Sequence, residues 1–235
     1  MINSIKNNIK KMFNYYGWKL TKIYRNKNYT NSKPNLKLLE AMHASKGILH
    51  MGAHRGTESA VYDWFHKKTL WIEANPKIYT DLKNNINIYI NQKAYNILLH
   101  EFDNEVFSFN ISNNDGASSS IYNFGAESLK DNLEMVETIK LKSKKIDTFF
   151  LQESIQAKDY DFWVMDIQGA ELPVLKGAQK SLESCNFIYV EVSSGDFYKN
   201  GTQWSELKNF LKKKNFENQW EPQDKHKDIL FKKNN

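Results

Sequence analysis

The 235-residue chain has little cysteine, no long apolar run and no acidic residue in its first part. A single cysteine, Cys185, excludes an intrachain disulfide and a zinc site built from several cysteines, so a reducing, cytoplasmic setting is expected. No segment approaches the roughly 18 apolar residues that a membrane-spanning helix needs. The basic N-terminus has no continuous apolar stretch before a small-residue cleavage site, and no secretory signal is predicted.

Positive charge is concentrated at the start of the chain. Residues 1–39 hold nine Lys and Arg and no acid, whereas the rest of the chain holds 24 basic and 27 acidic residues. The net charge of +6 therefore comes from the first 39 residues, and the remainder is close to neutral. Because a protein that binds nucleic acid normally carries a basic surface on its folded body, no nucleic-acid partner is expected.

Residues 1–45 are predicted to form a basic helical extension. Apolar residues recur there at spacings of three and four, which places them on one face of a helix with lysines on much of the other. Such a helix can lie on an anionic membrane, as a peripheral contact through residues 1–25, or pack over the folded domain with its lysines in water. Packing is the favoured interpretation.

From residue 46 to residue 235, short apolar runs alternate with helical patterns, which predicts one α/β domain. Strands are expected over 48–51, 69–73, 88–92, 162–166 and 187–192, an antiparallel strand over 106–111, and a terminal hairpin from 216–220 and 228–232. Helices are expected over 57–66, 76–87, 170–182 and 204–214, and the core should hold Trp64, Trp71 and Trp163. In such a sheet, ligands bind beyond the carboxyl ends of the parallel strands.

Two glycines follow the first predicted strand, in the segment His50-Met51-Gly52-Ala53-His54-Arg55-Gly56-Thr57-Glu58. They permit a sharp turn and let a ligand lie against bare main chain. The middle glycine of the dinucleotide fingerprint is missing, which argues against NAD and against a phosphate-binding loop. The spacing suits S-adenosylmethionine, whose tail is an amino acid without phosphate. The alternative is a tight strand-to-helix turn that holds no ligand.

Acidic residues end two of the predicted strands. Glu73 lies about twenty residues after the glycine turn, where a carboxylate can accept both hydroxyls of a ribose, although it can also cap the following helix. Asp166 ends an apolar strand, so its charge points into the ligand crevice or is buried at a cost. Glu171 lies in the first turn of the next helix, where the helix dipole favours an acid whatever its function.

Together these motifs resemble the FkbM-type S-adenosylmethionine-dependent methyltransferases over about residues 46–235. The resemblance rests on Gly52-Ala53-His54-Arg55-Gly56, Trp71-Ile72-Glu73-Ala74-Asn75-Pro76, Ser118-Ser119-Ser120 and Asp166-Ile167-Gln168-Gly169-Ala170-Glu171-Leu172. It implies a class I methyltransferase fold, a Rossmann-like three-layer sandwich with a mostly parallel seven-stranded sheet and a C-terminal antiparallel hairpin. It also implies S-adenosylmethionine as cofactor and O-methylation of a hydroxyl on a sugar, a glycan or a related small molecule.

The resemblance further implies which residues hold the cofactor, namely Gly52, Ala53, His54, Gly56, Glu58, Glu73, Ala74, Ser119 and Asp166. One departure from the family pattern is His50, because many members carry there an acid that holds the methionine end of the cofactor. Glu58 or Asp166 can take over that contact.

Methyl transfer to an alcohol also requires a base, because the hydroxyl must lose its proton as it attacks. Candidates at the strand ends are Asp166, His54 and Glu191. Asp166 is given a cofactor-side or base role, and His54 or Glu191 an acceptor-side role; His54 could equally be a structural histidine bonded to backbone. No ligand spacing demands a metal ion, and none is expected.

Two other classes of function remain open. A nucleic-acid methyltransferase shares the fold, but the chain lacks an Asn/Asp-Pro-Pro-aromatic motif for exocyclic amines and a Pro-Cys pair for cytosine C5. A non-catalytic binding module that keeps the fold is the more serious alternative, because of His50. Cofactor binding without turnover on any acceptor would favour that alternative.

Overall fold

The structure is a computed structural model that describes residues 35–193, 196–222 and 226–234. The described residues from Leu36 onward belong to one compact unit. The helix expected over residues 1–25, with its membrane or packing contact, lies outside the described residues. No helix in the described part is long and apolar enough to cross a membrane.

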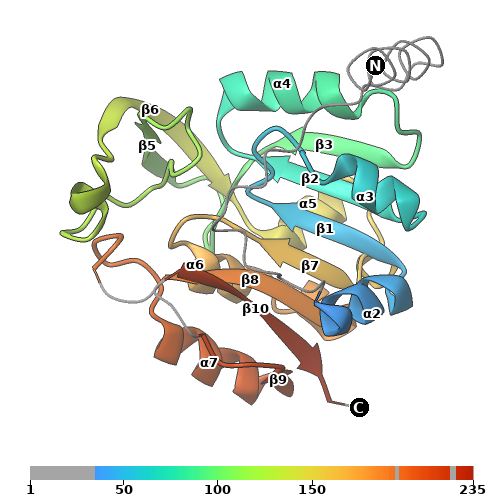
Figure 1. Cartoon of the computed structure of the whole chain (residues 1–235). Helices are drawn as coiled ribbons and strands as arrows, with labels where there is room; N and C mark the ends of the chain where they lie inside the picture. The colour runs from blue at the N-terminus through green and yellow to red at the C-terminus, as the bar shows by residue number, and fades with distance from the viewer. Residues whose placement is uncertain (1–34, 194–195, 223–225, 235) are drawn as a thin grey trace, which may run out of the picture. The chain divides into compact units, whose positions relative to one another are not determined.

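A seven-stranded sheet forms the centre of this unit, with the strand order β3-β2-β1-β7-β8-β10-β9 (Figure 1). Strands β1, β2, β3, β7 and β8 run parallel to one another, while β10 is antiparallel to both β8 and β9. The strand bounds are β1 (Gly47–Met51), β2 (Lys68–Glu73), β3 (Gln92–Asn96), β7 (Phe162–Met165), β8 (Phe187–Ser193), β9 (Phe216–Asn218) and β10 (His226–Lys233). This mostly parallel sheet with a C-terminal antiparallel hairpin confirms the expected class I methyltransferase fold.

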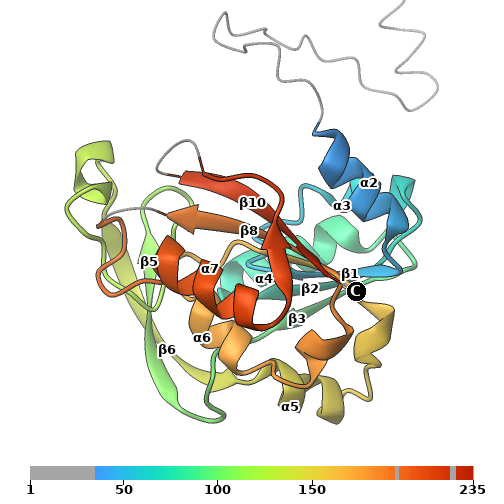
Figure 2. The same ribbon diagram turned by 90° about the horizontal axis from the view of Figure 1, so that it is seen from below.

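Helices cover both faces of the sheet, because the side chains of each strand alternate between two apolar clusters. One cluster, which includes Leu49 and Trp163, packs under α5, α6 and α7. The other, which includes Ile48 and Phe162, packs under α2, α3 and α4 (Figure 2). The helix bounds are α2 (Leu36–Ala44), α3 (Ser59–Trp64), α4 (Pro76–Ile86), α5 (Ile146–Gln152), α6 (Glu171–Lys176) and α7 (Trp204–Lys213). These layers are the three-layer sandwich that the sequence predicts.

Between β3 and α5 the chain forms a separate three-stranded arm, at the end of the sheet toward which β1 and β2 point (Figure 1). Its strands are β4 (Leu98–Leu99), β5 (Val106–Ser112) and β6 (Met135–Lys144), in the order β4-β6-β5. Strand β5 pairs antiparallel with β6, which confirms the alternating strand predicted over residues 106–111. Strands β4 and β6 and helix α5 were not predicted from the sequence.

Two predicted elements have the wrong bounds. The strand predicted over residues 88–92 is a loop in which Ile90 is 99% exposed, and β3 begins only at Gln92, the residue that pairs with Thr69 of β2. Pairing with β2, and not the local run of isoleucines, decides where the strand lies. The helix predicted over 170–182 ends at Lys176, with Gly177 as its C-cap, and a separate 3-10 helix follows at Ser181–Ser184. A Cβ on Gly177 would lie 2.4 Å from the carbonyl oxygen of His100, so only glycine fits at this point.

The buried face of α3 is also different from the one predicted. Trp64, expected in the core, is 81% exposed, whereas Tyr62 is buried and stacks on the indole of Trp71 with ring centroids 5.1 Å apart. The helix buries Ser59 and Tyr62, and that face excludes Trp64. Trp71 and Trp163 are fully buried, as predicted.

A buried lysine joins helix α2 to the sheet. Lys67 Nζ donates hydrogen bonds to the carbonyl oxygens of His43 (2.9 Å) and Ser45 (2.5 Å), at the C-terminal end of α2. The last carbonyls of a helix have no partner within the helix, and a cation there also interacts favourably with the helix dipole. Lys67 therefore fixes the position in which α2 buries Ala41 and Met42 against the sheet.

Replacing this lysine should destabilise the domain. We expect Lys67→Met to lower the free energy of unfolding by about 1–3 kcal/mol, because it removes the hydrogen bond from Lys67 to the buried carbonyl oxygen of Ser45. Urea unfolding followed by circular dichroism measures the change. The neighbouring Lys68→Met, at an exposed position, is the matched control and should stay within about 0.5 kcal/mol of wild type. Equal unfolding curves for the two variants would contradict this role of Lys67.

Candidate active site

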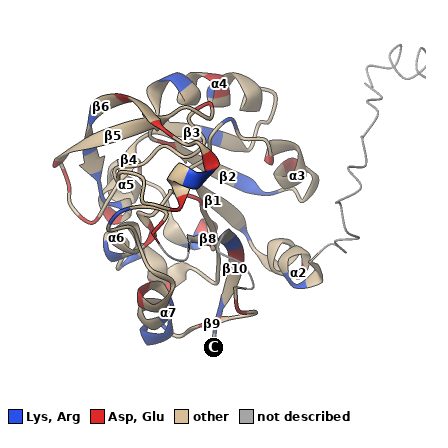
Figure 3. Cartoon of the chain, turned by 60° about the vertical axis from the view of Figure 1, so that its left-hand side comes forward, with Lys and Arg blue, Asp and Glu red and all other residues tan. Residues whose placement is uncertain are grey.

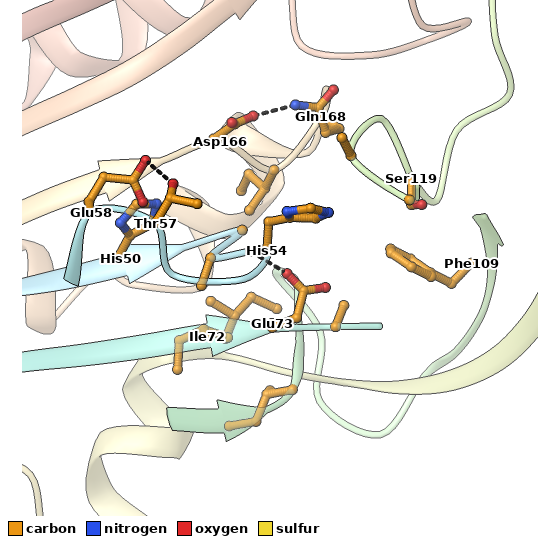
Figure 4. A pocket seen from close by; sticks show the side chains of 18 residues that line it. His50, His54, Thr57, Glu58, Ile72, Glu73, Phe109, Ser119, Asp166 and Gln168 are labelled. Atoms are coloured by element: carbon orange, nitrogen blue, oxygen red, sulfur yellow. Dashed lines mark hydrogen bonds between the residues drawn. The ribbon is translucent and has the colours of Figure 1, made fainter. Parts of the chain in front are cut away.

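A cavity of about 270 Å³ lies at the carboxyl ends of β1, β2 and β7 (Figure 4). Every residue expected to hold the cofactor lines this cavity except Gly56. Of the three candidate bases, Asp166 and His54 line it, and Glu191 does not. The structure thus brings the expected residues together at the edge of the sheet where a parallel fold places its ligands; their individual roles stay predictions.

The two glycines of the turn after β1 have different structural roles. Gly52 has φ +79°, and a Cβ built on it would lie 1.8 Å from the carbonyl oxygen of Asp166, so only glycine lets the ends of β1 and β7 approach this closely. Gly56 has φ +66°, and a Cβ there would meet Leu82 of α4 at 2.6 Å. Gly56 therefore packs the turn against α4 and lies away from the cavity, unlike its expected place at the cofactor.

The carboxylate of Glu73 is held by backbone donors at both oxygens. Oε2 accepts a hydrogen bond from the N–H of His54 (2.8 Å), and Oε1 accepts one from the N–H of Asn75 (2.7 Å). Burial raises the pKa of Glu73, and these N–H donors oppose the rise. Helix α4 is capped by Asn75, whose side chain accepts a hydrogen bond from the N–H of Lys77, and not by the side chain of Glu73. Each carboxylate oxygen keeps a lone pair for a ligand hydroxyl.

His50 cannot act as the acid that it replaces. Its Nδ1 is 3.0 Å from the hydroxyl of Tyr62, and its ring stacks on Trp71 with centroids 4.8 Å apart. Burial lowers the pKa of His50 to about 4, against the opposing effect of the Glu58 carboxylate. The ring is therefore neutral at pH 7 and part of the packing between β1, β2 and α3.

His54 is held by hydrogen bonds from both its backbone and its ring. Its N–H donates to Glu73, and its ring Nε2 donates to the carbonyl oxygen of Asp115 at 3.1 Å. It also has a positive φ of 45°, which is unusual for a residue other than glycine. These contacts hold His54 in place, and its ring faces the cavity (Figure 4).

Asp166 and Glu191, at the ends of β7 and β8, form a pair of carboxyl groups bridged by Gln168. The Nε2 of Gln168 donates to Oδ1 of Asp166 and to Oε2 of Glu191, the latter at 3.1 Å. Burial, and next the nearby charge of Glu191, raises the pKa of Asp166 well above its usual range. Burial also raises the pKa of Glu191, which the hydrogen bond from Asp166 opposes. Two neighbouring carboxyls resist double ionisation, which adds to the effect of burial on this pair.

Gln168 is fixed in turn by the loop between β5 and β6 and by the segment after β8. Its carbonyl oxygen accepts a hydrogen bond from Oγ of Ser120 (2.7 Å), and its side-chain oxygen accepts one from the hydroxyl of Tyr198. Tyr198 is buried against Phe124 and Phe197. These bonds hold the bridging amide in place between the two carboxyls.

Glu171, in the first turn of α6, is a third buried acid near this pair. Its Oε1 accepts the N–H of Gly169 at 3.0 Å, and burial raises the pKa of Glu171 to about 7. This contact orders the turn between β7 and α6. Within the described residues, no three His, Cys, Asp or Glu side chains are grouped so that they could hold a metal ion.

The remaining walls come from residues that the sequence analysis did not single out. They are the apolar side chains of Ile72 on β2, Ile97 just before β4, Leu99 on β4 and Phe109 on β5, together with the loop residues Gly116 and Ala117. Ser119, which was expected, lies beside Phe109 in Figure 4.

Sequence comparison identifies the family of this chain. A family model described as the methyltransferase FkbM domain matches residues 50–217, which includes every acidic and glycine residue of the cavity described above. The chain belongs to the FkbM methyltransferase family. S-adenosylmethionine is the cofactor that membership of this family implies, in agreement with the arrangement around Glu73. No curated protein matches the chain.

Solved methyltransferase structures resemble the chain at low sequence identity. A TehB-like SAM-dependent methyltransferase from Corynebacterium glutamicum is 10% identical, covers 100% of both chains and has a TM-score of 0.47. Precorrin-6y C5,15-methyltransferase from Geobacter metallireducens is 11% identical, with 84% of this chain and 86% of the other covered and a TM-score of 0.43. Both scores are below 0.5, so neither likeness says what this FkbM-family chain methylates.

The raised pKa of Glu171 makes stability depend on pH. Between pH 4.5, the ordinary pKa of a glutamate, and about pH 7, the unfolded chain releases this proton while the folded protein retains it. The free energy of unfolding therefore falls as pH rises through this window. In Glu171→Gln, which keeps an acceptor for Gly169, this loss should be smaller by up to about 3 kcal/mol. Urea unfolding from pH 4 to 8 measures this difference. If the free energy of unfolding of wild type and of Glu171→Gln depended on pH in the same way, the effect of burial on Glu171 would be excluded.

Proposed function

We propose that the chain transfers a methyl group from S-adenosylmethionine to a hydroxyl of a sugar, a glycan or a related small molecule. One observation carries this proposal: the same cavity holds Glu73, a carboxylate fixed by two backbone donors, and Asp166, a carboxyl group with a raised pKa. The first suits a ribose diol, and the second suits a base for an alcohol.

The residues present fit the cofactor. Glu73 offers two oriented oxygens to the ribose hydroxyls, and the apolar side chains Ile97, Leu99 and Phe109 can pack against the adenine. The main chain at Gly52 and Ala53 leaves room beside the turn for the methionine tail. Because His50 is neutral and engaged with Tyr62, the charge of the ammonium group would be balanced by Glu58 or by Asp166 in its ionised form.

When bound, S-adenosylmethionine supplies a methyl group that is already activated by a sulfonium. The chain must then hold the acceptor oxygen in line with that methyl group, an effect worth roughly 7–11 kcal/mol. Asp166, in its ionised form, accepts the proton of the attacking hydroxyl, which contributes about 10²–10⁴-fold. Gln168 and Glu191 keep Asp166 oriented, which is the role we assign to Glu191 because it does not line the cavity.

The charge around the cavity supports an uncharged acceptor. Among the described residues that line it, none is Lys or Arg, while His54, Glu58, Glu73 and Asp166 offer polar groups. Figure 3 shows Lys and Arg interspersed with Asp and Glu over the described helices and strands. The hydroxyls of a polyhydroxylated molecule can donate hydrogen bonds to such carboxylates and accept them from protonated carboxyl groups. The negative charge of the carboxylates would repel a phosphate.

A non-catalytic binding module is the second candidate, and the specific observation that favours it is His50. The acid that commonly holds the methionine end is replaced by a neutral ring that packs inside the domain. In this version the cavity still binds S-adenosylmethionine through Glu73, but no acceptor turns over.

Transfer of a labelled methyl group from S-adenosylmethionine to a panel of sugar and other hydroxyl acceptors tests the proposal. We expect product with wild type, a loss of at least about 10²-fold in Asp166→Asn, and wild-type rates in Asp63→Asn, an exposed acid on α3. Transfer should also increase with pH, because the raised pKa of Asp166 keeps this base protonated at lower pH.

Two results would contradict the proposal. Full activity of Asp166→Asn would show that Asp166 is not the base. Binding of S-adenosylhomocysteine by the wild-type protein, with no transfer to any hydroxyl acceptor, would favour the binding module instead.

A further inference from the structure

The loop of residues 113–119, between β5 and β6, forms one wall of the cofactor cavity. Gly116, Ala117 and Ser119 line the cavity, and Figure 4 shows Ser119 on the opposite side of it from Glu58. The loop is internally cross-linked: Ser112 Oγ bonds to the side-chain oxygen of Asn114 (2.6 Å) and accepts from the N–H of Ser118 (3.0 Å). Such a loop is expected to move as a unit, so its position depends on what holds it from outside.

Arg55 holds the tip of this loop. Its Nη1 and Nη2 donate to the two carboxylate oxygens of Asp115, the second bond being 3.0 Å long, and its Nε donates to Asp81 of α4 at 3.0 Å. The planar guanidinium thereby bridges a helix of the main domain and the loop of the arm. This paired geometry is one that arginine provides and lysine does not.

Arg55 is itself fixed on the side away from the loop. Its carbonyl oxygen accepts a hydrogen bond from Nδ2 of Asn85 (3.0 Å), and the next residue, Gly56, packs on Leu82, so α4 holds the backbone of the turn. The backbone from which the side chain of Arg55 extends to the loop is therefore fixed by α4. On the loop side, the preceding residue, His54, adds a hydrogen bond from its ring to the carbonyl oxygen of Asp115.

We infer that Arg55 is a positioning residue, which holds the 113–119 loop against the cofactor cavity through Asp115 and thereby sets the affinity for the cofactor. The inference rests on the proposed binding of S-adenosylmethionine in this cavity. Arg55 does not line the cavity. It acts through Asp115 on Gly116, Ala117 and Ser119, and no part of it needs to contact the ligand.

The effect should be moderate and sensitive to salt. The side chains of Arg55 and Asp115 are 29% and 70% exposed, and exposed ion pairs contribute little individually, although bidentate ones contribute more. We therefore expect losing the pair to raise the Kd about three- to tenfold. Because salt screens exposed charges, the wild-type Kd should rise with ionic strength toward the value of the variants.

Calorimetric titration with S-adenosylhomocysteine tests the inference on the full chain. Arg55→Gln and Asp115→Asn should each raise the Kd, the double variant should add little to either, and Arg55→Lys should not restore the wild-type value. The matched control is Lys77→Gln, which breaks the 2.8 Å ion pair of Lys77 with Glu137. That pair also joins α4 to the arm, but away from the loop, so its loss should leave the Kd unchanged.

The two single variants also separate a contact from a long-range charge effect. Arg55→Gln lowers the net charge and Asp115→Asn raises it, so a field effect would change the Kd in opposite directions. The inference predicts the same direction for both. Opposite changes, no change in either variant, or an equal change in Lys77→Gln would each overturn it.

Hydrogen exchange in the protein without ligand gives a readout that is independent of cofactor binding. The amide of Gly116 bonds to the carbonyl of Ser112 (3.2 Å), and that of Ser119 bonds to the carbonyl of Gly116 (3.1 Å). Exchange across the loop should be faster in Arg55→Gln than in wild type or Lys77→Gln, and equal exchange would overturn the role of Arg55. If the wild-type protein binds no S-adenosylhomocysteine, the proposed function fails, while exchange still decides whether Arg55 holds the loop.

Discussion

The buried carboxylate of Glu73 connects two segments that lie far apart in the sequence, the turn after β1 and the start of α4. It binds the N–H of His54 on one side and the N–H of Asn75 on the other. The same turn is tied to β2 through the carbonyl oxygen of Ile72, which accepts from Gly52 and Ala53 at 3.0 Å each. Without these bonds, neither the backbone beside the cavity nor the direction of Arg55 would be defined, and the loop beyond Arg55 would lose its anchor.

The acids at the carboxyl ends of β7 and β8 cost the domain stability and give it reactivity. Burial raises the pKa of Asp166, Glu191 and Glu171, so each would be easier to accommodate as an amide. Their partners, Gln168 and the N–H of Gly169, offset only part of that cost. Gln168 also has a positive φ of 56°. Strain and raised pKa values in one place are typical of sites selected for chemistry and not for stability.

Much of the fold and about half of the cavity follow from local patterns in the sequence. Gly52, Glu73 and Asp166 could be found because each ends a short apolar strand, and parallel strands bring their ends to one edge. Phe109 and Gly116 could not, because they reach the cavity only through the pairing of β5 with β6, which joins residues about thirty apart without a local signal.

The errors in the core have the same physical origin. Ile90 and Trp64 are apolar and locally suited to a strand and a buried helix face, yet both are exposed. Which residues are buried depends on partners that lie elsewhere in the chain: Thr69 pairs with the first residue of β3, and Trp71 stacks on Tyr62, the buried aromatic residue of α3. Hydrophobicity alone does not specify these partners.

The most direct test is calorimetric titration of the full chain with S-adenosylmethionine, beside Glu73→Gln. The account predicts binding with a Kd in the micromolar range and a Kd at least about tenfold higher in the variant, because a charged acceptor for the ribose hydroxyls is lost. The melting temperature without ligand shows whether the variant is folded. An absence of binding to wild type, or equal affinity of a folded Glu73→Gln, would contradict the assignment of this cavity to the cofactor.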